Sequence, residues 1–161
     1  MSERQAKCLV SACLAGFPCR YDGKTKTCDA IAKLYKLGLA RPICPESLSG
    51  LAVPREPTEK RGEKYFSRSG KDVTENILRG AEKAFQKADQ SDLRVAILKG
   101  RSPSCGVGEI YDGSFTGATR PGNGAFAQKL LDAGFSVYTE ENIPDAILEL
   151  ATSIDDNDQY V

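Results

Sequence analysis

The stretch "LRVAILKGRSPSCG", residues 93–106, decides how this chain folds. Its first half, residues 93–99, is an apolar run of strand length, which is typical of a strand buried inside a sheet. The second half contains glycine, proline and two serines, which together indicate a sharp turn. Because this turn carries Cys105, the segment predicts a buried strand whose carboxyl end is followed at once by a thiol.

Strand and helix patterns alternate outward from this segment in both directions. Three more short apolar runs predict strands at residues 8–13, 40–44 and 135–140. Amphipathic patterns predict helices at residues 28–38, 72–89, 124–135 and 142–151. The second of these helices is expected to begin with a capping box of Asp72 and Glu75. Repeated strand–helix units predict an α/β fold, with a mostly parallel sheet and helices on both of its faces.

The chain is expected to form a single domain over residues 1–161, with its core at about 7–151 and a frayed acidic tail at 152–161. A length of 161 residues is enough to bury a core without disulfides or metal. We find no internal repeat and no linker that would divide the chain.

Two long connections, residues 47–71 and 100–123, interrupt the strand–helix scheme and are expected to lie over the carboxyl edge of the sheet. The second contains "EIYDGSFTG" (109–117), where an Asp-Gly turn between alternating residues predicts a small hairpin. Loops of this length inside a compact domain are usually functional or disordered.

The composition excludes several classes of function. Lysine and arginine total 22, equal to aspartate and glutamate, so nothing electrostatic favours nucleic-acid binding. No apolar run approaches the ~20 residues of a membrane span, and the polar N-terminus lacks a signal sequence, which predicts a cytoplasmic protein. The chain has no histidine, so catalysis by proton transfer must use a carboxylate, a lysine, a tyrosine or a thiol.

The chain has six cysteines, which in a reducing compartment point to metal or redox chemistry. Three of them, Cys13, Cys44 and Cys105, follow or end three predicted strands. Because the carboxyl ends of parallel strands share one edge of a sheet, these thiols can meet there; the alternative is three unconnected buried thiols. Cys8 is expected to be core and Cys28 structural, and the sequence leaves Cys19 open between ligand and bystander.

The chemistry of three thiolates without histidine suits few metals. A structural zinc site usually has four protein ligands, and the chain contains no CxxC pair. An iron–sulfur cluster accepts thiolates from scattered positions, and three of them leave one iron without a protein ligand. Such an iron is a soft Lewis acid, suited to a substrate that carries sulfur.

Five motifs occur in a fixed order: "VSACLAGFPCRYDG" (10–23), "CPESLSGLAVPREPTE" (44–59), "GKDVTENILRGAE" (70–82), "LKGRSPSCG" (98–106) and "IYDGSFTGATRPGNG" (110–124). Together they resemble the thiouracil desulfidase family, over about residues 8–142. The resemblance implies a Rossmann-like α/β protein with a 4Fe-4S cluster that is held by three cysteines. It also implies hydrolysis of thiouracil to uracil without net redox change, with the sulfur of the substrate passing to the open iron.

The resemblance also assigns roles to residues. It implies Cys13, Cys44 and Cys105 as cluster ligands, Glu46 as the acid–base residue and Ser102 as a partner of the substrate. Three positions depart from the family pattern: Ser49 replaces a glycine, Ala15 replaces a leucine, and Arg101 adds a charge beside Ser102.

Further residues of the same motifs are candidates for the substrate pocket. Ser104 and Arg55 are expected to join Ser102 in binding the substrate. Arg55 and Glu59 form either a lid pair over the pocket or a plain surface salt bridge. Asp22 and Asp112, each in a "YDG" sequence, are expected to form turns rather than to act in catalysis.

The function predicted from the sequence is therefore a hydrolytic, non-redox desulfidase that acts on a small thiolated base such as thiouracil. Two other readings remain open: a carrier that delivers sulfur or iron–sulfur units without turnover, and a structural metal module. The protein is expected to act as a monomer or weak dimer, without nucleic acid or membrane.

Overall fold

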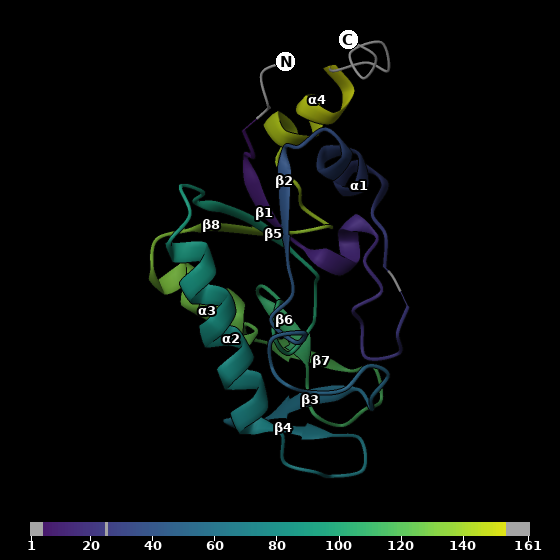
Figure 1. Ribbon diagram of the computed structural model, residues 1–161. Coiled ribbons are helices and arrows are strands. Elements are labelled where there is room, and N and C mark those ends of the chain that lie inside the picture. Colours follow the sequence, from purple (N-terminus) through teal and green to yellow (C-terminus); the bar gives the residue numbers. More distant parts are fainter. Residues whose placement is uncertain (1–4, 25, 154–161) are drawn as a thin grey trace.

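A computed structural model describes residues 5–24 and 26–153 of the chain (Figure 1). Its centre is a parallel sheet of four strands in the order β2-β1-β5-β8. The strands are β1 (Cys8–Ser11), β2 (Ala40–Ile43), β5 (Val95–Leu98) and β8 (Ser136–Thr139). In the middle of the sheet, Val10 pairs with Pro42 on one side and with Ile97 on the other. The predicted α/β class, the parallel sheet and its four strands are confirmed.

The first strand is shorter than predicted. It ends at Ser11, and a single turn of 3-10 helix, η1 (Ala12–Ala15), follows it. The turn closes at Gly16, whose φ of +107° is one that residues with a Cβ rarely adopt. Cys13 therefore lies just beyond the strand instead of ending it, but still at the carboxyl edge of the sheet.

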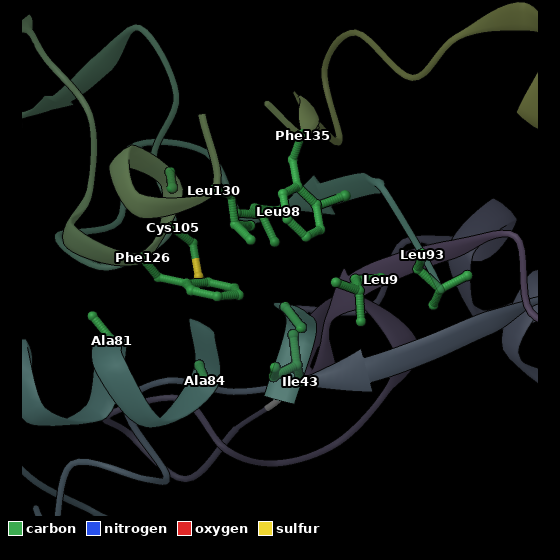
Figure 2. Packing of buried hydrophobic residues seen from close by; sticks show 13 residues of the cluster. Leu9, Ile43, Ala81, Ala84, Leu93, Leu98, Cys105, Phe126, Leu130 and Phe135 are labelled. Carbon is green, nitrogen blue, oxygen red and sulfur yellow. The ribbon is translucent and has the colours of Figure 1, made fainter. Parts of the chain in front are cut away.

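Helices cover both faces of the sheet, as predicted. They are α1 (Asp29–Lys36), α2 (Thr74–Asp89), α3 (Ala125–Asp132) and α4 (Asp145–Ser153). Side chains of α2 and α3 pack with Leu9 and Leu98 in one apolar cluster, which Figure 2 shows around Phe126. Side chains of α1 and α4 pack with Val10 and Ile97 in a second cluster. Because neighbouring residues of a strand point to opposite faces, Leu9 and Val10 divide between the two clusters.

Each of the two long connections folds into a hairpin. The first contains the antiparallel pair β3 (Thr58–Arg61) and β4 (Lys64–Ser67), which the sequence did not predict. The second contains β6 (Glu109–Tyr111) and β7 (Thr119–Pro121), so the predicted hairpin exists, although its second strand lies farther along the chain. Both hairpins lie beyond the carboxyl end of β5, below the sheet in Figure 1.

Two details of the helices differ from the prediction. The capping box at α2 is wrong: Val73 precedes the helix, and Asp72 accepts a hydrogen bond from the amide of Thr74 (2.9 Å) rather than from that of Glu75. At the other end of the chain, α4 continues to Ser153, so residues 152 and 153, which were predicted to belong to a frayed tail, are helical. Residues 154–161 of that tail lie outside the described part of the chain.

Glycines let two helices approach the turns that carry cysteines. A Cβ atom on Gly80 of α2 would lie 2.2 Å from the carbonyl oxygen of Pro45, in the turn after Cys44. A Cβ atom on Gly124, which precedes α3, would lie 2.6 Å from the amide nitrogen of Cys105. Both distances are far below van der Waals contact, so neither position accommodates a side chain without a backbone shift.

We therefore expect Gly80→Ala to destabilise the fold by about 1–3 kcal/mol, the usual cost of overpacking. The direction of this change in stability is informative, because alanine inside a helix normally stabilises the helix by about 0.5–1 kcal/mol relative to glycine. Urea unfolding of the two proteins measures the difference, and Lys83→Ala on the exposed face of α2 is the control. A stabilised Gly80→Ala protein would contradict this close packing of α2 on the Cys44 turn.

Candidate functional site

A cavity of about 340 Å³ lies at the carboxyl edge of the sheet. The ends of β1 and β2 and the segment directly after β5 contribute to its wall, and so do both hairpin connections. Open parallel sheets bind ligands at this edge, where the strands diverge into loops. The cavity is therefore where the topology predicts a functional site.

The structure brings the three predicted cluster ligands to this cavity. Cys13 comes from η1, Cys44 follows β2 directly, and Cys105 lies in the turn after β5. Because β1 lies between β2 and β5 in the sheet, three neighbouring strand ends deliver the three thiols. Cys105 also borders the core, where Figure 2 shows it beside Phe126.

A fourth thiol, that of Cys19, also lines the cavity. It is hydrogen-bonded to the thiols of both Cys13 and Cys44. The loop that carries it folds back onto η1, where the Lys26 amide donates to the Cys13 carbonyl oxygen (3.2 Å). The position that the sequence left open is thus part of the site.

The other two cysteines lie elsewhere. Cys8 is buried near the start of β1, where its thiol contacts the Leu39 carbonyl oxygen at 3.9 Å, so it belongs to the core as predicted. Burial raises its pKa to about 11. Cys28 precedes α1, packs against the second apolar cluster and is not among the residues that line the cavity.

Three of the thiols at the cavity, those of Cys19, Cys44 and Cys105, are held in their neutral form. The hydrogen bond to Cys13 and burial raise the pKa of Cys19 to about 11. The hydrogen bond to Cys19 and burial raise the pKa of Cys44 far above its ordinary value, and burial does the same for Cys105. Thiolates therefore form here only together with a cationic partner, which is the condition under which cysteines bind metal and release their protons.

The spacing of the donor groups does not suit a single metal ion. Within residues 5–24 and 26–153, no group of three cysteine, aspartate or glutamate side chains is arranged to hold one ion. In an iron–sulfur cluster each thiolate binds a different iron, so the ligands do not converge on one point. A cluster therefore fits these thiols better than a structural zinc ion does.

Ser102 lines the cavity and organises the turn that holds Cys105. Its Oγ accepts hydrogen bonds from the amides of Ser104 and Cys105, each at 3.1 Å. A hydroxyl has two lone pairs and one hydrogen, so these bonds occupy both lone pairs. The remaining function of the hydroxyl is to donate its hydrogen to another group.

Glu46 lines the cavity two residues after Cys44. Its Oε1 accepts a hydrogen bond from Nη2 of Arg55 at 2.6 Å, in an ion pair whose arginine side chain is only 8% exposed. Among the described residues, none donates a hydrogen bond to the second oxygen, Oε2. The arginine thus fixes the orientation of the carboxylate and leaves one oxygen available.

The predicted pairing of Arg55 with Glu59 is wrong. Arg55 contacts Glu46 instead, and its backbone amide donates to the Tyr21 carbonyl oxygen at 2.6 Å. Glu59 is buried, and its Oε1 accepts hydrogen bonds from the backbone amides of Gly113 and Phe115 at 3.0 and 3.1 Å. The carboxylate of Glu59 therefore ties the first hairpin to the loop of the second.

Three positions singled out from the sequence, Arg55, Ser104 and Arg101, are not among the residues that line the cavity. Ser104 is buried behind the Cys105 turn, where its Oγ has no hydrogen-bond partner among the described residues, and it is not part of the lining. Arg101 directs its guanidinium to Glu109 (3.5 Å) and Glu141 (2.8 Å), away from the lining. The extra charge of Arg101 beside Ser102 therefore does not enter the cavity.

Sequence reasoning missed several residues of the lining. At the end of β1, the Oγ of Ser11 accepts the amide of Lys99 at 2.8 Å and is hydrogen-bonded to the Cys105 thiol. Lys99 in turn forms an ion pair with Glu140 at 2.8 Å. Ser11 could have been found as the polar residue that closes an otherwise apolar strand, two positions before Cys13.

Comparison with known proteins identifies a family and two similar proteins. The sequence profile of the 2-thiouracil desulfurase family matches residues 8–142. The solved structure of the 4Fe-4S-dependent thiouracil desulfidase TudS is 42% identical and superposes with a TM-score of 0.81, covering 92% of this chain and 99% of that one. The uncharacterized protein YbbK of Bacillus subtilis (strain 168) is 40% identical over 149 residues, which are 86% of this chain and 99% of YbbK.

In residues 5–24 and 26–153, none of the helices has the length and apolar character needed to cross a membrane.

The match of the family profile covers most of the chain, and two relatives are similar over nearly their whole length. The chain therefore belongs to the 2-thiouracil desulfurase family.

Proposed function

We propose that this protein is a desulfidase that hydrolyses a thiolated pyrimidine such as thiouracil, using a 4Fe-4S cluster held by Cys13, Cys44 and Cys105. One observation carries the proposal: thiols from three neighbouring strand ends share a cavity with Glu46 and Ser102. The family match and the name of TudS, a 4Fe-4S-dependent thiouracil desulfidase, point to the same chemistry.

The residues present fit such a cluster. The three thiols come from three separate segments, and the raised pKa values of Cys44 and Cys105 keep these two thiols neutral until a metal binds. When bound through three thiolates, a 4Fe-4S cluster supplies one iron that can take a soft sulfur ligand and act as a Lewis acid.

The proposed reaction is balanced without electrons: thiouracil and water give uracil and hydrogen sulfide. Oε2 of Glu46 takes one proton from the water as the oxygen of that water bonds to the ring carbon. When the carbon–sulfur bond then breaks, that proton and the second proton of the water leave with the sulfur as hydrogen sulfide. Arg55 holds Oε1 throughout, so the carboxylate does not have to reorient. Ser102 donates its hydrogen to the substrate, because both lone pairs of its Oγ already accept backbone amides.

A hydrolytic reaction and a carrier reaction predict different products. We expect the anaerobically reconstituted protein to contain about four irons and four sulfides per chain and to release sulfide from thiouracil over many turnovers. In water enriched in oxygen-18, the new carbonyl oxygen of uracil should carry the label, without added reductant. One sulfide per chain and no further release would support the carrier, and stoichiometric zinc without sulfide would support the structural module.

The same proposal places the protein in the cytoplasm, acting on a free small molecule as a monomer or weak dimer. All six cysteines are free thiols, which suits a reducing compartment. Equal numbers of acidic and basic residues, 22 each, give no electrostatic support for a nucleic-acid partner.

A further inference from the structure

Phe115 has an unusual backbone conformation at the wall of the cavity. Its φ is +58°, in the left-handed region that bulky side chains rarely occupy. Strained residues of this kind persist only where the surrounding structure holds them, and they gather at functional sites. Phe115 lines the cavity and is neither fully buried nor fully exposed.

The strained conformation is held by Glu59 of β3. Oε1 of Glu59, a buried carboxylate, accepts the amides of both Gly113 and Phe115. Nη2 of Arg61 donates to the Gly113 carbonyl oxygen at 2.9 Å, which adds a second link between the same two segments. Gly113 also packs closely, because a Cβ there would lie 3.0 Å from the Lys60 carbonyl oxygen. The loop that carries Phe115 is thus fixed to a strand more than 50 residues earlier.

Phe115 contributes to the cavity from the hairpin side. The guanidinium of Arg68 lies over the Phe115 ring, 5.8 Å from its centre, and both residues line the cavity. Cys13, Cys44 and Cys105 line the same cavity from segments that follow strands of the sheet, whereas Phe115 lines it from the connection between β6 and β7. A flat molecule held at the thiols would therefore have an aromatic ring within reach.

We propose that Phe115 determines specificity by stacking on the planar ring of the substrate, and that Glu59 is the positioning residue that sets the Phe115 ring in place. Aromatic side chains stack on the faces of nucleobases, and the contact tolerates changes in ring substituents. The inference rests on the proposed function and adds a substrate class to it: planar unsaturated heterocycles that bear a thiocarbonyl group, in preference to small acyclic thioamides.

The test compares thiouracil with thiourea, which carries the same thiocarbonyl group but has no ring. With the loaded enzyme we expect Phe115→Leu to raise KM for thiouracil about 5- to 100-fold, the usual loss of one stacked base. KM for thiourea and kcat should change much less. Phe115→Tyr keeps the ring and should keep most of the affinity for thiouracil. Phe17→Leu removes an aromatic ring that does not line the cavity and is the matched control.

Glu59 is tested by rescue. Glu59→Ala should raise KM for thiouracil as Phe115→Leu does, because the loop loses the acceptor of its two amides. Glu59→Gln retains an acceptor oxygen and should restore a low KM. A merely structural role of Glu59 would instead lower iron content and kcat for both substrates together.

A second readout separates this proposal from the proposed function. Calorimetry with uracil requires no turnover, and Phe115→Leu should weaken uracil binding by a factor similar to the change in KM. If the wild-type protein binds uracil but releases no sulfide from thiouracil, the proposed desulfidase function is wrong. The stacking role of Phe115 is then still tested by the calorimetry. Three results would overturn the stacking role. The first is an equal rise in KM for thiouracil and for thiourea in Phe115→Leu. The others are unchanged uracil binding in Phe115→Leu and no uracil binding by the wild type.

Discussion

Replacing Cys13, Cys44 or Cys105 by serine is expected to abolish assembly of the cluster. Each of the three thiols comes from a different strand end. Serine is similar in size, but its hydroxyl is a hard ligand that seldom replaces thiolate at iron. Iron and sulfide content should fall from about four of each per chain to near zero, together with the visible absorption of the cluster.

Cys8→Ser and Cys28→Ser are the matched controls, because neither thiol lines the cavity. Both should retain iron and sulfide, although Cys8→Ser places a hydroxyl in the core near the Leu39 carbonyl oxygen. Cluster loss in either control, with retention in one of the three proposed ligand variants, would show that the ligand set is wrong.

Cys19→Ser distinguishes a three-thiolate site from a four-thiolate site. The Cys19 thiol is hydrogen-bonded to two of the proposed ligands, so proximity alone does not exclude it as a fourth ligand. We expect the variant to retain its cluster, because the proposed reaction needs one iron without a protein ligand. Complete loss of iron would make Cys19 a ligand and would remove the coordination site on which sulfur binding depends.

The parts of the fold that were predictable are those with a strong local pattern. The apolar run around Ile97 and the amphipathic stripe of α2 each reflect burial against a neighbouring layer, so their periodicity is visible in the sequence. The pair β3–β4 was missed because its residues, "TEKR" and "KYFS", are mostly polar and pair with each other outside the main sheet. Such a hairpin shows neither an apolar run nor a clean alternation.

The candidate site was predictable where topology alone decides it. Strand-end cysteines meet because parallel strands share one edge, which needs no knowledge of side-chain geometry. The partner of Arg55 could not be predicted in this way. Glu59 lies closer in the sequence, but the turn after Cys44 brings Glu46 to the guanidinium, while Glu59 is occupied by two amides. Contacts of this kind depend on how a loop folds, which residue order does not show.

Glu46→Gln is expected to lower turnover of thiouracil by roughly 10²–10⁴-fold, the usual contribution of a general base. Glutamine keeps the size of the side chain and an acceptor oxygen for Arg55, but it cannot take a proton from water. Because the thiols are untouched, iron and sulfide content should equal that of the wild type. Added thiouracil should still perturb the visible absorption of the cluster, so the loss should lie in kcat rather than in binding.

The matched control is Glu56→Gln, an exposed glutamate whose carboxylate accepts the amide and hydroxyl of Ser69 at 2.8 and 2.7 Å, away from the cavity. This variant should turn over thiouracil at the wild-type rate. Arg55→Leu provides a second check, because it removes the group that orients Glu46 and should lower kcat while leaving the carboxylate in place. If Glu46→Gln retained ordinary turnover, Glu46 would have no role in proton transfer. The base would then be sought among the other groups of the lining that can accept a proton, with Lys99 and Tyr111 as the next to replace.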